Sequence, residues 1–263
     1  MTVSTEKPAA GSAPIEPRRA GPELLLEVVF RPLANAFVPL LARAGIAPHA
    51  VVLANAAVGL VAALFLASGD LIAAAVLLQV KTLLDNLDGQ LARATERVTV
   101  VGRYLDTVAD LVVNAALFTA LGYVTGQPFL AAASFVALTL VLAVDFNVSE
   151  LYRQAHGIAG QRPAPTGSRS ERALASVYRA LFAPLDGAVR SISAWRFPGH
   201  QTYDRFTVTF LANLGLTTQL AALGLCLLLG APSAFLWFAL ACLAALVPLQ
   251  LHAERQARAA IAS

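Results

Sequence analysis

The sequence predicts an all-α integral membrane protein with six transmembrane helices and an N-terminal amphipathic helix in the membrane interface. The first observation is composition: 57% of the 263 residues are hydrophobic and 13% are charged, which is too apolar for an ordinary soluble domain. The second is that the apolar residues fall in runs of about twenty, the length that crosses a bilayer as a helix. The third is that the basic residues gather in alternate connections between these runs.

The N-terminal part of the chain divides into a tail and a helix. Residues 1–22 are rich in Ala, Pro, Gly and Ser, so we expect a disordered cytosolic tail. Residues 23–44 have helical periodicity, with Glu23, Glu27 and Arg31 recurring every four residues in an otherwise apolar segment. Such a charged stripe is typical of a helix that lies in the membrane interface. A further transmembrane helix is the alternative, but it would place the arginines of the tail on the wrong side of the membrane.

Six apolar runs form the domain that we expect over residues 45–254. The predicted spans are residues 49–68, 71–94, 101–123, 129–150, 206–229 and 234–251. Short turns with Gly-Asp, Gly-Gln-Pro and Gly-Ala-Pro separate the first, third and fifth spans from the next. A long polar loop, residues 157–203, separates the fourth span from the fifth, and a charged C-terminus, residues 255–263, follows the sixth.

The basic residues predict the orientation of the spans. Apart from Lys81, all of them lie in the tail, the interface helix, the second and fourth connections and the C-terminus. Cytoplasmic loops carry an excess of Lys and Arg, so we expect a protein of the cell inner membrane with both termini in the cytosol. This distribution accounts for the net charge of +3, and we expect no nucleic-acid partner.

The long loop of residues 157–203 contains apolar residues at helical spacing with arginines between them. A basic amphipathic segment is typical of a helix on the anionic inner leaflet. A solvated loop is the alternative. Within the loop, Pro184 is expected to start a new helix, because proline is favoured at the first helical position.

Four aspartates lie inside the second and third apolar runs: Asp85, Asp88, Asp106 and Asp110. A carboxylate at the centre of a membrane helix costs roughly 2.5–3.5 kcal/mol on insertion scales, so this cluster needs compensation. Positions i, i+3 and i, i+4 share one helix face, so each pair of aspartates points one way. If the two helices form an antiparallel pair joined by the turn at residues 95–99, the two pairs of carboxylates converge.

Converging carboxylates repel one another unless cations lie between them. Hard oxygen ligands favour Mg²⁺, Mn²⁺ or Ca²⁺ over zinc, and four facing carboxylates suit two metal ions, the arrangement used for displacement at phosphorus. We therefore expect a two-metal site. The structural alternative is that the aspartates only form ion pairs with Lys81 and the nearby arginines. Lys81, four residues before Asp85 on the same face, is expected to pair with it.

The aspartates belong to a longer pattern, D-x-x-D-G-x-x-A-R, eight residues, then G-x-x-x-D-x-x-x-D. Its fixed positions are Asp85, Asp88, Gly89, Ala92, Arg93, Gly102, Asp106 and Asp110. This pattern resembles the signature of the CDP-alcohol phosphotransferase (CDP-alcohol phosphatidyltransferase) family. The six-span layout, with the motif across spans two and three, is similar as well. The resemblance covers most of residues 45–252.

The resemblance implies a phospholipid-synthesising enzyme that moves a substituted phosphate from a CDP-alcohol to a second alcohol and releases CMP. It implies that Asp85, Asp88 and Asp106 hold the metal ions. Asp110 would complete the metal site and act as general base on the acceptor hydroxyl, which a carboxylate within hydrogen-bond reach is able to do.

The resemblance also implies a nucleotide site. Gly89 and Ala92 would let the cytidine nucleotide approach the helix closely, and Arg93 would hold the diphosphate. The expected donor is CDP-diacylglycerol and the expected acceptor a small polar alcohol. A CDP-linked headgroup with diacylglycerol as acceptor is the alternative. A homodimer is implied by the resemblance alone.

Two other classes of protein use intramembrane aspartates. Intramembrane prenyltransferases bind a diphosphate with aspartates and Mg²⁺, but Gly89, Ala92, Arg93 and Gly102 at this spacing argue against that class. A cation transporter would use the four aspartates without a nucleotide. The sequence shows no inverted repeat or broken helix, which transporters of this kind typically contain.

Overall fold

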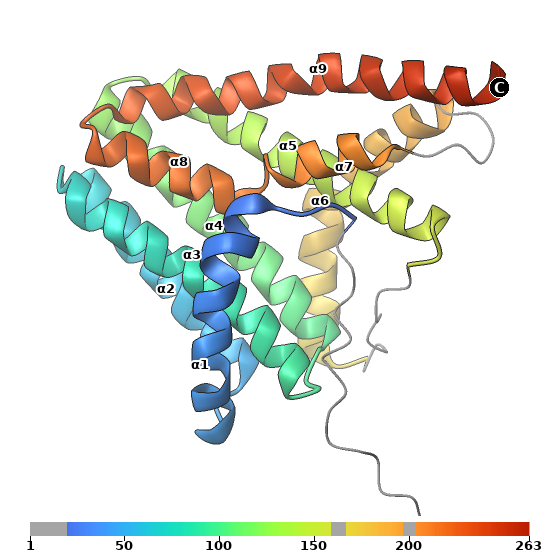
Figure 1. Ribbon diagram of the computed structural model, residues 1–263. Helices are drawn as coiled ribbons and strands as arrows, with labels where there is room; N and C mark the ends of the chain where they lie inside the picture. Colours follow the sequence, from blue (N-terminus) through green and yellow to red (C-terminus); the bar gives the residue numbers. More distant parts are fainter. Residues whose placement is uncertain (1–19, 159–166, 197–202, 263) are drawn as a thin grey trace, which may run out of the picture.

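The computed structural model describes residues 20–158, 167–196 and 203–262, and all regular secondary structure in these segments is helical. The elements are η1 (Leu26–Phe30), α1 (Arg31–Arg43), α2 (Pro48–Ala67), α3 (Leu71–Ala94), α4 (Val100–Thr125), α5 (Pro128–Ala155), α6 (Arg169–Arg196), α7 (Arg205–Ala212), α8 (Leu216–Leu228) and α9 (Pro232–Ala262). Figure 1 shows α1 and α6 directed crosswise to the long helix α9. The predicted tail lies almost wholly outside the described residues.

Short sequence signals determine where the central helices begin and end. Asp70 caps α3 by accepting a hydrogen bond of 3.0 Å from the backbone three residues on. Thr99 caps α4 in the same way, with the N–H of Gly102 donating to its hydroxyl at 3.0 Å. Gly126, at φ 66°, ends α4 in the left-handed conformation, and Pro128 then begins α5. These turns give the tight hairpins that the sequence predicts.

The hydrophobic core lies between α2, α3, α4, α5, α8 and α9 and consists mainly of Ala, Leu and Phe side chains. Phe118 of α4 contacts the rings of Phe135 and Phe235 at centroid distances of 5.8 Å. Large apolar side chains also cover the outer surface, where Leu64 is 69% and Phe129 90% exposed. Lipid tails are as apolar as these side chains, so the outer surface fits a bilayer rather than water.

Four helices, α2, α4, α5 and α9, are long and apolar enough to cross a membrane, and α7 with α8 adds a fifth if the bent pair is one span. The remaining predicted span is α3, which has 24 residues. It contains Lys81, Asp85 and Asp88, so composition alone does not mark it as a span. The structure therefore supports a helical membrane domain, and the count of six depends on α3.

The fifth predicted span, residues 206–229, is not one straight helix. The structure bends by 42° between α7 and α8, at Asn213–Gly215, so the expectation of an unbroken helix was wrong here. The side chain of Asn213 accepts a hydrogen bond from the N–H of Leu24 and donates one to the carbonyl of Pro22, both at 2.9 Å. Asn213, at the break, is thus hydrogen-bonded to the segment that precedes η1. No local pattern in residues 206–229 encodes this contact.

The helix predicted over residues 23–44 is present as η1 followed by α1. Leu26 and Phe30 are buried against the domain, whereas Leu40 is 63% exposed. Glu27 and Arg31 form an ion pair within this helix. An exposed apolar face next to a charged pair is compatible with the membrane interface, and the interfacial location itself stays a prediction.

In the part of the long loop that the structure describes, residues 169–196 form one continuous helix, α6, which packs against α4 and α5. Pro184 lies inside α6, so the prediction that it starts a new helix was wrong. It is on the exposed face, where water reaches the carbonyl group that proline leaves without a donor.

Asn147 of α5 donates to Asp186 at 2.7 Å and accepts from Arg190 at 3.3 Å. Burial, and then the nearby Asp186, raise the pKa of Tyr178 to about 12, so its hydroxyl stays protonated and donates to Asp186.

The sixth predicted span and the charged C-terminus form one helix, α9, of 31 residues. The residues beyond position 251 are mostly Ala, Arg, Glu and Gln, which are strong helix formers. The charge therefore ends the apolar segment without ending the helix.

Candidate active site

The four motif aspartates lie on α3 and α4, as the sequence predicts. The two helices hardly contact each other; instead α2 packs extensively against both. The predicted antiparallel pair is therefore held together by a third helix. A Cβ atom at Gly59 of α2 would lie 2.5 Å from a methyl carbon of Val113 on α4 and 3.2 Å from Lys81 on α3. Glycine is required at this position because three helices meet there.

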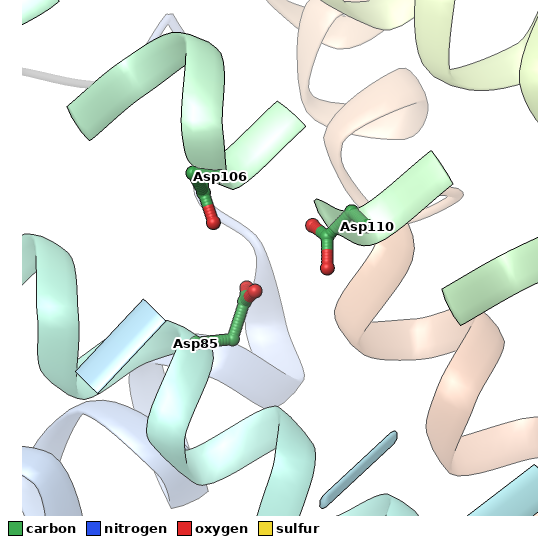
Figure 2. A group of neighbouring side chains, drawn as sticks. All are labelled: Asp85, Asp106 and Asp110. Atoms are coloured by element: carbon green, nitrogen blue, oxygen red, sulfur yellow. The ribbon is translucent and has the colours of Figure 1, made fainter. Parts of the chain in front are cut away.

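Three of the aspartates, Asp85, Asp106 and Asp110, form a carboxylate group. One oxygen of each lies within 4.8 Å of the others. Figure 2 shows Asp85 on α3 pointing toward Asp106 and Asp110 on α4. All three are partly buried. Magnesium and manganese take carboxylate oxygens and complete their coordination with water or substrate phosphate, so this donor set fits a divalent metal.

Asp88 lies outside this carboxylate group. Its side chain is buried, 7% exposed, and its Oδ2 atom has no hydrogen-bond donor in the part of the chain that the structure describes. The Oδ1 atom of Asp106 is likewise buried without a hydrogen-bond donor among the described residues. A buried carboxylate oxygen without a donor costs free energy unless a cation or proton meets it. These two atoms therefore also favour a cation at the site, although the role of Asp88 as a ligand stays a prediction.

Two polar side chains, Lys81 and Asn55, donate hydrogen bonds to the carboxylate group. The ammonium group of Lys81 donates to Asp110 Oδ1 at 2.7 Å and lies 3.8 Å from Asp85 Oδ1. The predicted ion pair with Asp85 is thus the longer of two contacts. Asn55 of α2 donates to Asp85 Oδ1 at 3.0 Å. Asn55 is not a position of the motif; its signal in the sequence is one polar residue in a helix that is otherwise almost wholly apolar.

The residues predicted to bind the nucleotide follow the aspartates along α3. The guanidinium group of Arg93 lies over Gly89, since a Cβ atom there would be 3.4 Å from Nη1. Gly89 therefore leaves the helix surface beside Asp88 open to this guanidinium, which is suited to phosphate oxygens. Ala92 is partly buried on the same helix end, and Gly102 belongs to the cap of α4. Binding of a nucleotide by these residues stays a prediction.

Comparison with known proteins identifies the family. The model of the CDP-alcohol phosphatidyltransferase family matches residues 46–245, which include every site residue described above. The chain belongs to this family. The resemblance noted from the motif is thereby confirmed.

Two curated relatives match part of this chain. It is 37% identical over 98 residues to the inner membrane protein YnjF of Escherichia coli (strain K12), covering 37% of this chain and 46% of that protein. It is 29% identical over 115 residues to the bifunctional IPC transferase and DIPP synthase of Thermococcus kodakarensis, covering 41% of this chain and 26% of that protein. The chain thus spans less than half the length of either relative. No solved structure matches it.

Proposed function

We propose that this CDP-alcohol phosphatidyltransferase transfers a substituted phosphate from CDP-diacylglycerol to a small polar alcohol and releases CMP. The observation that supports the proposal most directly is the convergence of Asp85, Asp106 and Asp110 from α3 and α4 inside the region that the family model matches. One relative is itself named as a transferase. The exposed apolar surface of the domain suits a donor whose acyl chains remain in the bilayer.

The proposed reaction is a displacement at phosphorus. The acceptor hydroxyl oxygen attacks the phosphorus that bears the alcohol of the donor, and the bond from this phosphorus to the bridging oxygen breaks. The electron pair of that bond leaves with CMP, and the hydroxyl proton passes to the Asp110 carboxylate. Of its two oxygens, Oδ1 is held by Lys81, which fixes the orientation of the base.

The residues of the motif are proposed to bind two kinds of ligand, metal ions and the nucleotide. The four aspartates, Asp85, Asp88, Asp106 and Asp110, hold two Mg²⁺ or Mn²⁺ ions, which when bound neutralise the charge of the diphosphate and of the departing CMP. Arg93 binds the diphosphate in fork geometry. Gly89 and Ala92 leave room for the cytidine against the helix.

The proposal includes a placement in the membrane. The catalytic domain, residues 45–254, crosses the inner membrane six times, with α3 counted as a span beside α2, α4, α5, the bent pair α7–α8 and α9, and with both termini in the cytosol. This placement puts the aspartates near the cytosolic face, where a water-soluble CMP is able to leave. It follows from the arginine distribution. We further propose that the protein acts as a homodimer.

The function is tested by CMP release from the purified protein in lipid micelles with Mg²⁺ or Mn²⁺. CDP-diacylglycerol is supplied with a panel of small alcohols, and Asp106→Asn serves as the inactive control. We expect CMP release that requires one acceptor and stops when EDTA removes the metal.

Two results would change the proposal. Release only when CDP-linked headgroups and diacylglycerol are supplied would reverse the donor and acceptor. Absence of CMP under all these conditions, together with pyrophosphate release when a prenyl diphosphate and an aromatic acceptor are supplied, would instead indicate a prenyltransferase and overturn the proposed reaction.

A further inference from the structure

The side chain of Lys81 is wholly buried in the middle of α3, at 0% exposure. Its ammonium group contacts two of the three members of the carboxylate group, Asp110 at 2.7 Å and Asp85 at 3.8 Å. Its aliphatic stem is placed by packing, because Cδ lies 3.2 Å from where a Cβ of Gly59 would be. The cation is therefore built into the site by the meeting of α2 and α3.

Among the residues that the structure describes, one charged and one neutral side chain donate to the carboxylate group. Lys81 donates to Asp110, and Asn55 donates to Asp85 at 3.0 Å. Of these two donors, Lys81 is the one that changes the net charge of the group. An ammonium group is costly inside a membrane domain unless carboxylates compensate it, and here the compensating carboxylates are the same ones that fit a metal.

We propose that Lys81 is a resident counter-ion of the carboxylate group, which stabilises the metal-free protein and lowers the affinity of the site for a divalent cation. The proposal rests on the proposed metal site and goes beyond it, because Lys81 is not a position of the motif. A divalent cation bound to Asp110 and Asp85 lies close to the ammonium group, and like charges repel strongly where water is largely excluded. The binding affinity for the metal is thus a balance between three carboxylates and one fixed cation.

The affinity is measured by titrating the full-length protein with Mn²⁺ and following the free ion by electron paramagnetic resonance. Lys81→Met keeps the length of the side chain and removes its charge. We expect Lys81→Met to bind Mn²⁺ at least about tenfold more tightly than wild type. Asn55→Ala is the matched comparison, because it removes a neutral donor to the same group and leaves the charge unchanged; we expect Lys81→Met to bind Mn²⁺ more tightly than Asn55→Ala does.

Stability in EDTA gives a second readout that does not depend on a metal. We expect Lys81→Met to unfold at a lower temperature than wild type in EDTA, because the carboxylates lose their counter-ion. Adding Asp110→Asn to Lys81→Met should restore most of the difference, since the pair is then removed together. Lys81→Gln serves in the same comparisons if the methionine variant does not accumulate in membranes.

The possible results separate the two proposals. Wild type that binds Mn²⁺, with equal or weaker binding by Lys81→Met, overturns the counter-ion role and leaves the metal site standing. No Mn²⁺ binding by wild type or any variant overturns both. Equal unfolding temperatures of wild type and Lys81→Met in EDTA also overturn the counter-ion role.

Discussion

Asp110 is the residue on which the contacts of the site converge. It shares the carboxylate group with Asp85 and Asp106, and it accepts the 2.7 Å contact from Lys81. A carboxylate with one oxygen held by a fixed donor is oriented before substrate binds, and such preorganisation is what a general base requires.

Asp110→Asn is expected to lower kcat for CMP release by about 10²–10⁴-fold, because the amide is not able to take the hydroxyl proton. The measurement is steady-state CMP release at saturating donor, acceptor and metal. Asp70→Asn is the matched control: Asp70 caps the opposite end of α3, and asparagine caps equally well. Full activity of Asp110→Asn would remove this residue from the proposed chemistry.

Gly59→Ala is expected to destabilise the protein by about 1–3 kcal/mol, because the new methyl group would lie 2.5 Å from a methyl carbon of Val113, whose χ1 angle is stiff. The measurement is the unfolding midpoint in detergent. Gly187→Ala is the matched control, since nothing lies within 4 Å of the new atom in α6. Equal stability of the two variants would contradict the tight packing of α2 against α4.

At the scale of elements, α6 differs from what the sequence predicts for the long loop, because it is one helix that continues through Pro184. It is attached to α5 through Asn147, Asp186 and Arg190. The ring of its Tyr178 packs against that of Tyr104 on α4 at a centroid distance of 5.1 Å, tilted by 38°. Tyr104 lies two residues before Asp106. The loop helix is therefore in contact with the same turn of α4 that bears the site.

Asn147→Ala is expected to raise the amide hydrogen exchange rate of α6 by about tenfold, because two hydrogen bonds between α5 and α6 are lost. The measurement is exchange followed by mass spectrometry of peptides within residues 169–196. Ser176→Ala is the control, since the Ser176 hydroxyl donates to the carbonyl of Ala173 within α6 itself. Unchanged exchange in Asn147→Ala would mean that other contacts hold the helix.

At the scale of the whole molecule, the helices have two apolar surfaces, one packed in the core and one exposed. This arrangement fits a bilayer, and the arginine distribution predicts which face of it is cytosolic. Both native cysteines are free, at Cys226 and Cys242 on α8 and α9, so replacing them by alanine gives a background for single reporter cysteines.

In that background, Ser68→Cys and Ser233→Cys are expected to react with a membrane-impermeant thiol reagent added outside spheroplasts. Ser176→Cys is expected to react only after the membrane is opened. The reason is that the connections at Ser68 and Ser233 contain no Lys or Arg. Labelling of Ser176→Cys in intact spheroplasts would contradict the proposed orientation of the long loop.

Much of the site could be predicted because it depends on spacing along single helices. Asp85 and Asp88 share one helix face, as do Asp106 and Asp110, whatever surrounds them. The turns were predictable for the same reason, since Asp70 and the glycines act on their own neighbours. The three-membered carboxylate group could not be predicted, because it depends on how α2 sets α3 and α4 relative to each other.

The sequence by itself determined the class of protein, the position of the motif and the ends of most helices, because composition, helical periodicity and capping are local properties. Only the tertiary structure decided that Lys81 is shared between Asp110 and Asp85, that α7 and α8 are bent around Asn213, and that α6 is one helix docked on α5. Each of these depends on contacts between residues far apart in the chain. Such contacts follow from the shapes of the packed helices, and no short segment contains that information.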